Sequence, residues 1–202
     1  MLRRSVMKIG VLSLQGDFDA HAKRLAQLGA DPVEVRYGEQ LDRVQGLVLP
    51  GGESTTNLIL LEEEGLWCPL HSFAAEKPIL GTCAGAILLA REVENPSQPS
   101  LAAIDMRIER NAYGRQSDSS IRVVEPEPMF ARRASGDALE AVFIRAPIIR
   151  SVGPSVDVLL RDAGNPILVE QGRHLAATFH AELTDDTRLH ELFLGKVKSG
   201  HR

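Results

Sequence analysis

The sequence lacks several features that mark particular classes of protein. It has two cysteines, Cys68 and Cys83, which are too few for a disulfide framework and lack the spacing of a metal site. Its lysines and arginines are scattered and the formal net charge is −4, so the basic stripe of a nucleic-acid-binding protein is missing. No apolar run approaches the roughly 20 residues that span a bilayer. We therefore expect a cytoplasmic protein with no metal, no nucleic acid and no membrane among its partners.

Length and composition are those of an ordinary soluble globular protein. The chain has 202 residues, 44% of them hydrophobic and 25% charged, which is enough to bury a substantial core. We expect one domain, residues 1–202, because no linker, repeat or low-complexity tract divides it. Residues 1–6 lack the apolar stretch of a signal peptide, and Met7 stands directly before a strand-like run. We interpret residues 1–6 as an upstream extension.

The first half of the chain alternates short apolar runs with helical patterns. The expected strands are residues 8–14, 32–35, 46–50 and 78–80. A helix is expected from a cap at Asp17 through Leu28, with Gly29 ending it. Further helices are expected towards Glu64 and over residues 86–90. Strands that alternate with helices indicate βα units and a parallel sheet.

The second half reads as a series of short strands followed by one helix. The expected strands are residues 106–108, 121–124, 141–144, 158–160, 167–169 and 175–178, and the terminal helix is residues 185–198. Together the halves predict an α/β domain with mixed strands.

Residues 81–85, Gly-Thr-Cys-Ala-Gly, are the most informative segment. They form the thiol version of the G-x-S-x-G nucleophile elbow, between an apolar strand and an apolar helix. Small neighbours suit the tight turn, and a helix N-terminus favours the thiolate of Cys83. The backbone N–H of Ala84 would then be free to donate to an oxyanion. The structural alternative is a buried cysteine in a glycine-rich turn.

A cysteine nucleophile needs a base and a group that orients the base. His180 and Glu182 stand two residues apart at the end of an apolar strand, where positions i and i+2 point the same way. The other five histidines have weaker contexts, with His21 and His190 in expected helices. Alone, His180 is equally well interpreted as a core or surface histidine. With the elbow cysteine, it predicts a Cys-His-Glu triad.

Gly51 and Gly52 follow another expected strand. Ligands of open α/β sheets bind at the carboxyl ends of strands, and glycines let backbone amides approach them closely. Gly52 N–H is therefore our candidate for a second oxyanion donor, although a Gly-Gly pair alone indicates only a turn.

Taken together, these motifs resemble the class I glutamine amidotransferases. They are Pro50 to Thr55, Gly81 to Gly85 and the late His180-x-Glu182. Within that class the chain is similar to the glutaminase subunits of pyridoxal 5′-phosphate synthase, through residues 13–16 (Ser-Leu-Gln-Gly), 109–116 (Glu-Arg-Asn-Ala-Tyr-Gly-Arg-Gln) and 143–147 (Phe-Ile-Arg-Ala-Pro). The resemblance implies a flavodoxin-like three-layer fold with a mixed, mainly parallel central sheet.

The resemblance also implies an activity and a partner. L-Glutamine would be hydrolysed to glutamate and ammonia, and a (β/α)₈-barrel synthase subunit would use the ammonia to build pyridoxal 5′-phosphate (vitamin B6) in a hetero-oligomer. Cys83 would be the nucleophile, His180 the base and Glu182 its orienter, with no cofactor. Glutamine would be held by Gly52, Glu53, Ser54, Arg110, Ile144 and Arg145. Many relatives have proline where this chain has Ala181, a change that removes no functional group.

Two other functions remain open at this stage. The first is a glutaminase that serves another biosynthetic acceptor, which the elbow and triad fit equally well. The second is a non-catalytic flavodoxin-like binding module, which would be expected to lose a triad position. Arg110, Arg115 and Arg145 could also be solvated or ion-paired surface residues, and Cys68 is expected to be packed among its apolar neighbours.

Overall fold

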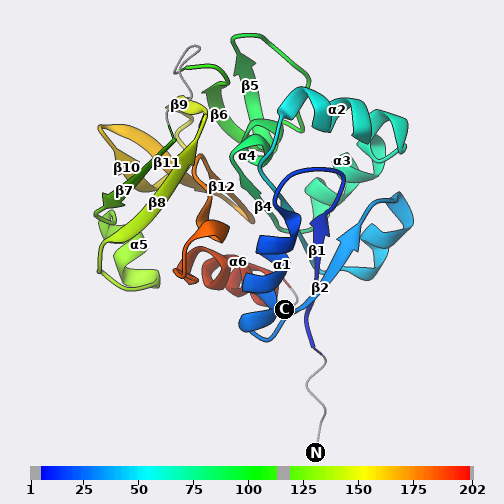
Figure 1. Cartoon of the computed structure of the whole chain (residues 1–202), viewed down its shortest axis with the longest axis horizontal. Helices are drawn as coiled ribbons and strands as arrows, with labels where there is room; N and C mark the ends of the chain where they lie inside the picture. The colour runs from blue at the N-terminus through cyan, green and yellow to red at the C-terminus, as the bar shows by residue number, and fades with distance from the viewer. Residues whose placement is uncertain (1–5, 113–118, 201–202) are drawn as a thin grey trace, which may run out of the picture.

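The computed structural model of the protein describes residues 6–112 and 119–200. Their main feature is a seven-stranded sheet of order β10-β11-β12-β4-β3-β1-β2 (Figure 1). The five strands from β12 to β2 are parallel to their neighbours, whereas β10 and β11 are antiparallel. The strands are β1 (Lys8–Leu12), β2 (Asp31–Val35), β3 (Gly46–Leu49), β4 (Ile79–Thr82), β10 (Asp157–Asp162), β11 (Asn165–Gln171) and β12 (His174–Ala177).

Two smaller sheets complete the strands that the structure describes. One has the order β5-β6-β9, and the other is the antiparallel hairpin β7-β8. Their strands are β5 (Ala90–Glu94), β6 (Ile104–Glu109), β7 (Ser119–Val124), β8 (Leu139–Ile144) and β9 (Ile148–Val152).

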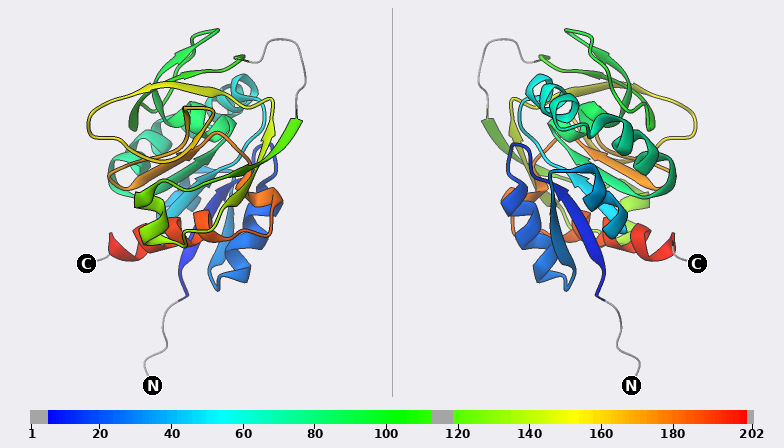
Figure 2. Two further views of the ribbon diagram at one scale, coloured as in Figure 1. Left: turned by 90° about the vertical axis from the view of Figure 1, so that its left-hand side faces the viewer. Right: turned by 90° about the vertical axis from the view of Figure 1, so that its right-hand side faces the viewer.

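Helices cover both faces of the main sheet (Figure 2). Buried side chains of α2, α3 and α4 form one apolar core with β5, β6 and β9, while those of α1, α5 and α6 form a second core with β8. The helices are α1 (Phe18–Gln27), α2 (Ser54–Glu63), α3 (Trp67–Glu76), α4 (Ala84–Leu89), α5 (Pro128–Arg133) and α6 (Arg188–Ser199), with 3₁₀ turns η1 (Gly38–Arg43) and η2 (Ala181–Leu183). The layers are therefore helix, sheet, helix.

The central strands are continuous apolar runs because both of their faces are covered. Every residue of β3, β4 and β12 is buried. The carboxyl ends of parallel strands meet at one edge of a sheet. The segments that follow β1, β3, β4 and β12 therefore converge, although they lie far apart in the sequence.

The predicted α/β architecture with a mixed, mainly parallel sheet is confirmed, and several local expectations are corrected. Ala90 starts β5 and does not end a helix, and α3, α5 and β9 were not predicted. Asp17 precedes α1, but its side chain makes no capping hydrogen bond. Cys68 is exposed, because α3 turns Leu70, Phe73 and Ala74 towards the core. Within the expected family motif, Tyr113 to Gln116 lie outside the described residues.

Candidate active site

Cys83 sits on a strained turn between β4 and α4. Its φ is +49°, a left-handed conformation that residues other than glycine adopt only at a cost. Its N–H donates to the carbonyl of Ala177 at 2.8 Å, which ties the turn to β12. A methyl group on Gly85 would lie 1.9 Å from the carbonyl oxygen of Leu49, and one on Gly81 would lie 2.5 Å from the backbone of Gly85. The predicted strand–turn–helix setting of the elbow is confirmed.

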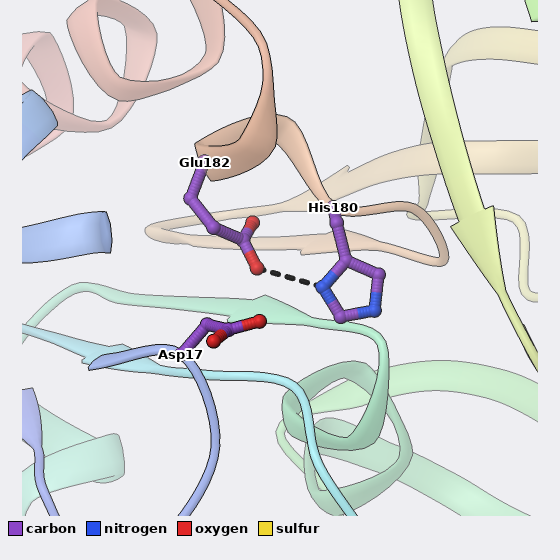
Figure 3. Close-up of side chains that lie close together, drawn as sticks. All are labelled: Asp17, His180 and Glu182. Carbon is purple, nitrogen blue, oxygen red and sulfur yellow. Dashed lines mark hydrogen bonds and ion pairs between the residues drawn. The ribbon is translucent and has the colours of Figure 1, made fainter. Parts of the chain in front are cut away.

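His180 and Glu182 form a buried pair beside this turn. His180 Nδ1 lies 2.7 Å from Glu182 Oε1 (Figure 3), and the backbone N–H of His180 donates to the carbonyl of Val142 at 2.8 Å. The predicted route to this pairing was wrong. β12 ends at Ala177, and His180 stands before the 3₁₀ turn η2, which contains Glu182. The two side chains meet because the chain turns back tightly after leaving the sheet.

The glycine at position 51 brings the cysteine and the histidine together. A methyl group there would lie 2.4 Å from His180 Cε1 and 3.3 Å from Cys83 Cβ, so both residues pack against its backbone. Cys83 Sγ lies 3.9 Å from the carbonyl oxygen of Ile144, and Cys83 also hydrogen-bonds to His180. The described structure therefore brings Cys83, His180 and Glu182 into one contiguous group.

The surroundings of His180 favour its protonated form. Burial lowers the pKa of His180, but the hydrogen bonds and charges of Cys83 and Glu182 outweigh burial and raise it to about 10. Burial raises the pKa of Glu182, yet His21 and His180 together hold it below its ordinary value. The pair is therefore an imidazolium and a carboxylate at neutral pH. An imidazolium beside a cysteine is the usual partner of a nucleophilic thiolate.

Asp17 is the third polar group at this position (Figure 3). One ligand atom from each of Asp17, His180 and Glu182 lies within 4.8 Å of the others. The hydrogen bond between His180 and Glu182 accounts for most of this clustering, and Asp17 is exposed. The absence of a metal requirement stays a prediction.

A cavity of about 270 Å³ opens in front of Cys83 and His180. All of the residues expected to hold glutamine line it, namely Gly52, Glu53, Ser54, Arg110, Ile144 and Arg145. Gly52 has φ +132° and Arg145 has φ +46°, so the backbone is constrained on both sides of the cavity. The volume suits a small polar molecule.

Glu53 and Arg110 are linked across the cavity wall. The Glu53 carboxylate accepts the backbone N–H groups of Thr55 and Thr56 at 3.1 and 2.7 Å, which caps α2. Arg110 Nη2 donates to Glu53 Oε1 at 3.0 Å and to Thr55 Oγ1 at 2.7 Å. Arg110 Nε is buried and has no partner among the described residues. A carboxylate ligand in the cavity could use this donor.

A second, larger cavity of about 810 Å³ lies near α6, at the amino ends of β3, β4 and β12. Its cations are already engaged. Arg133 and Lys196 both contact Glu170, at 2.7 and 2.9 Å, and Arg173 donates to the carbonyls of Ala75 and Glu76. The chemistry-bearing cavity is the smaller one at the other edge of the sheet.

His21 and His190 are the residues whose importance the sequence reasoning missed. Both are fully buried and lie behind Glu182. A signal existed for His21, because it stands three residues after Phe18 and four before Leu25, on the apolar face of its helix. An uncharged histidine buried there requires polar partners.

The fold and the cavity together define a class of protein. A structure described as a glutamine amidotransferase superposes on the chain with TM-score 0.84 and 43% identity, covering 94% of this chain and 98% of that one. The structure of a putative GMP synthase component from Thermoplasma acidophilum has TM-score 0.71 at 19% identity, covering 97% and 96%, which supports the fold alone. The fold is that of the class I glutamine amidotransferases.

Sequence comparison gives the family within this class. The family model for the SNO glutamine amidotransferase family matches residues 11–199. The pyridoxal 5′-phosphate synthase subunit PdxT of Solibacter usitatus is 57% identical over 94% of this chain and 99% of its own length. That of Koribacter versatilis is 55% identical over 96% and 98%. The chain belongs to the SNO glutamine amidotransferase family.

One further finding concerns the helices. Across residues 6–112 and 119–200, none combines the length and apolar character that crossing a membrane requires.

Proposed function

We propose that this protein is the glutaminase subunit of a pyridoxal 5′-phosphate synthase. It hydrolyses L-glutamine to L-glutamate and ammonia and delivers the ammonia to a barrel-shaped synthase subunit. The observation that carries the proposal is the convergence of Cys83, His180 and Glu182 at the mouth of a cavity lined by Glu53 and Arg110. That convergence provides a nucleophile, a proton carrier and a polar binding site in one place.

The proposed reaction begins with attack of Cys83 Sγ on the side-chain amide carbon of glutamine. The backbone N–H groups of Gly52 and Ala84 stabilise the oxyanion of the tetrahedral intermediate. The His180 imidazolium then gives its proton to the departing nitrogen, which leaves as ammonia, and a thioester remains on Cys83. Water, deprotonated by His180, attacks the thioester and releases glutamate. Glu182 holds the imidazole ring in place throughout.

Recognition of the substrate is assigned to the charged groups of the cavity wall. Free glutamine carries an α-carboxylate and an α-ammonium. The unpartnered Arg110 Nε suits the carboxylate. Glu53 lies at the same wall but is already bonded to Arg110 and to the start of α2. Its main contribution in this proposal is therefore to aim Arg110.

The acceptor of the ammonia is inferred from the relatives. Those at 46–57% identity are all named as pyridoxal 5′-phosphate synthase subunits. Glutaminases for other acceptors share the fold at identities below 20%, so their acceptors carry no weight here.

The first test of the function is replacement of the nucleophile. Cys83→Ala should reduce glutamine hydrolysis by about 10⁴-fold or more, because covalent catalysis is lost. A glutamine analogue that alkylates thiols should label Cys83 in the unaltered protein. Cys68→Ser is the matched control, since Cys68 is exposed on α3, and it should retain activity. Substantial hydrolysis by Cys83→Ala would contradict the mechanism.

The roles of the other two triad members are separated by their variants. His180→Asn should abolish turnover, whereas Glu182→Gln should impair it less, because Glu182 is one step further from the bond that breaks. Near-normal rates in His180→Asn would mean that the base lies elsewhere.

A further inference from the structure

A chain of buried polar groups continues from Glu182 away from the cavity. His21 Nε2 lies 3.3 Å from Glu182 Oε2, the oxygen that faces away from His180. His21 Nε2 also lies 3.0 Å from Thr82 Oγ1, and His21 Nδ1 lies 3.0 Å from His190 Nε2. Neither His21 nor His190 has any exposed surface. Three histidines and one carboxylate thus form a continuous line from α6 to the nucleophile.

The positions of the protons in this line can be assigned by elimination. Burial lowers the pKa of His21, although Glu182 and Asp17 pull it upwards and His180 lowers it further. Burial and then His21 lower the pKa of His190 to about 3. Each ring is therefore neutral and carries one proton.

Only one of the two arrangements satisfies the contacts. If His21 carried its proton on Nδ1, the lone pair of Nε2 would face the Glu182 carboxylate, and His190 would keep a buried N–H without an acceptor among the described residues. If the proton is on Nε2, it points towards Glu182 Oε2 and Thr82 Oγ1, and Nδ1 accepts the N–H of His190 Nε2. The atom left without a partner is then His190 Nδ1, an acceptor, which costs less than an unpaired N–H.

We propose that His21 is a positioning residue of the active site, which donates its Nε2 proton to the second oxygen of Glu182 and is itself held in that tautomer by His190. Resting on the glutaminase mechanism proposed above, this role makes the orienting unit a four-residue relay of hydrogen bonds. Glu182 is thereby bonded on both oxygens, so its carboxylate plane is fixed relative to the His180 ring.

Charged and titratable groups surround this relay on every packed element. His21 faces Glu182, His180 and Asp17, and His190 faces His21, Glu182, Arg24 and Asp186. Among these, Glu182 is the group whose charge His21 supports. Removing the donor should let Glu182 bind a proton at higher pH, and protonated Glu182 can no longer accept from His180.

Two amide substitutions separate donation from packing. In His21→Gln the amide nitrogen takes the place of Nε2 and can still donate to Glu182. In His21→Asn the shorter amide reaches only the place of Nδ1, so the donor to Glu182 is lost. His174→Asn is the matched control, because His174 is a buried histidine at the opposite end of the main sheet.

Glutamine hydrolysis should be measured from pH 5 to 9 with the synthase barrel subunit present. His21→Asn should lower kcat about 10- to 100-fold, the range seen when an outer hydrogen-bonding partner is removed at metal-bound histidines, with little change in KM. Its acid limb of kcat/KM should move to higher pH. His21→Gln should restore most of kcat and the original limb. His174→Asn should lower the melting temperature without moving the profile.

Equal losses in His21→Gln and His21→Asn, or an unmoved acid limb in His21→Asn, would overturn the proposal. A second measurement needs neither variants nor glutamine. The ¹⁵N shifts of the imidazoles in the unaltered protein should show His21 and His190 as Nε2–H tautomers, and an Nδ1–H tautomer at His21 would overturn the proposal. An inactive unaltered protein would instead refute the glutaminase function and leave the tautomer assignment to stand or fall on the shifts.

Discussion

At the scale of single residues, Cys83 and His180 depend on each other electrostatically. Cys83 is held with φ +49°, and such strain persists only where the surroundings enforce it. The surroundings here are the backbone of Gly85 against Leu49 and the bond from Cys83 to Ala177. The same turn presents Cys83 to His180, which Cys83 and Glu182 keep protonated.

The raised pKa of His180 predicts how its contribution to stability depends on pH. The folded pKa is about 10, against an ordinary value of 6.5. Because the folded state binds this proton more tightly, the stabilisation is fully present below about pH 6.5 and is lost as pH rises through about 10. Urea unfolding of the unaltered protein and of His180→Asn should therefore show a free-energy difference that shrinks from pH 6 to pH 10. A difference that stayed constant would mean that His180 is neutral in the folded protein.

At the scale of elements, the turn between β3 and α2 is the most constrained part of the site. It places Gly51 against His180, Gly52 beside Gln15, and Glu53 as the cap of α2. Gly52 has φ +132°, which side chains other than hydrogen rarely allow. One short turn therefore aligns the histidine, a candidate oxyanion donor and the binding arginine.

Gly51→Ala tests this turn directly. The added methyl would meet His180 Cε1 at 2.4 Å, and a displacement of about 1 Å at a catalytic group can cost on the order of 10²-fold in rate. We expect kcat to fall on that order while the protein stays folded. Gly195→Ala is the control, because Gly195 lies in α6 with nothing within 4 Å of the added methyl.

The control should stabilise the protein by about 0.5–1 kcal/mol, since glycine is a poor helix former, and leave turnover unchanged. Normal turnover in Gly51→Ala would show that the His180 ring can move without loss.

At the scale of the whole molecule, the edge of the sheet joins the catalytic group to the end of β1. Gln15 Nε2 donates to the Glu53 carbonyl at 2.7 Å, and the Glu53 N–H donates to Gln15 Oε1 at 3.3 Å. The Gln15 side chain thus holds the backbone directly after Gly52. A partner that touched this edge could change the direction of the Gly52 amide.

We predict low glutaminase activity alone and strong stimulation by the synthase subunit. Withholding one oxyanion donor typically costs about 10²–10³-fold in rate, which is enough to keep the free subunit nearly silent. Gln15→Ala should weaken the stimulation, because Glu53 and Gly52 lose their anchor. Equal rates with and without the barrel subunit, at saturating glutamine, would refute the coupling and leave the triad untouched.

We propose that residues 7–202 form the single functional domain. β1 begins at Lys8, and the carbonyl of Met7 accepts the N–H of Asp31 at 2.8 Å, whereas Val6 is 61% exposed. Deleting residues 1–6 should leave the melting temperature and the partner-stimulated activity unchanged. A clear fall in either would assign a structural role to the extension.

The sequence by itself determined the elbow, the glycine turn and the family. These features are local, because a tight turn at Cys83 and a close approach at Gly51 require small residues at neighbouring positions. The apolar runs of β1, β3 and β4 were equally legible, since strands buried on both faces must be apolar throughout. Their exact ends were not, as at Ala90, where the helix α4 passes directly into β5.

Only the tertiary structure decided what lies behind the triad. The spacing of His180 and Glu182 suggested a strand, whereas a 3₁₀ turn brings them together. His21 and His190 are 169 residues apart, yet their rings meet at 3.0 Å. Such a contact depends on how α1 and α6 pack on one face of the sheet, and no neighbouring residue records it. Local sterics are therefore readable from adjacent residues, but the groups that orient Glu182 become evident only when the layers are assembled.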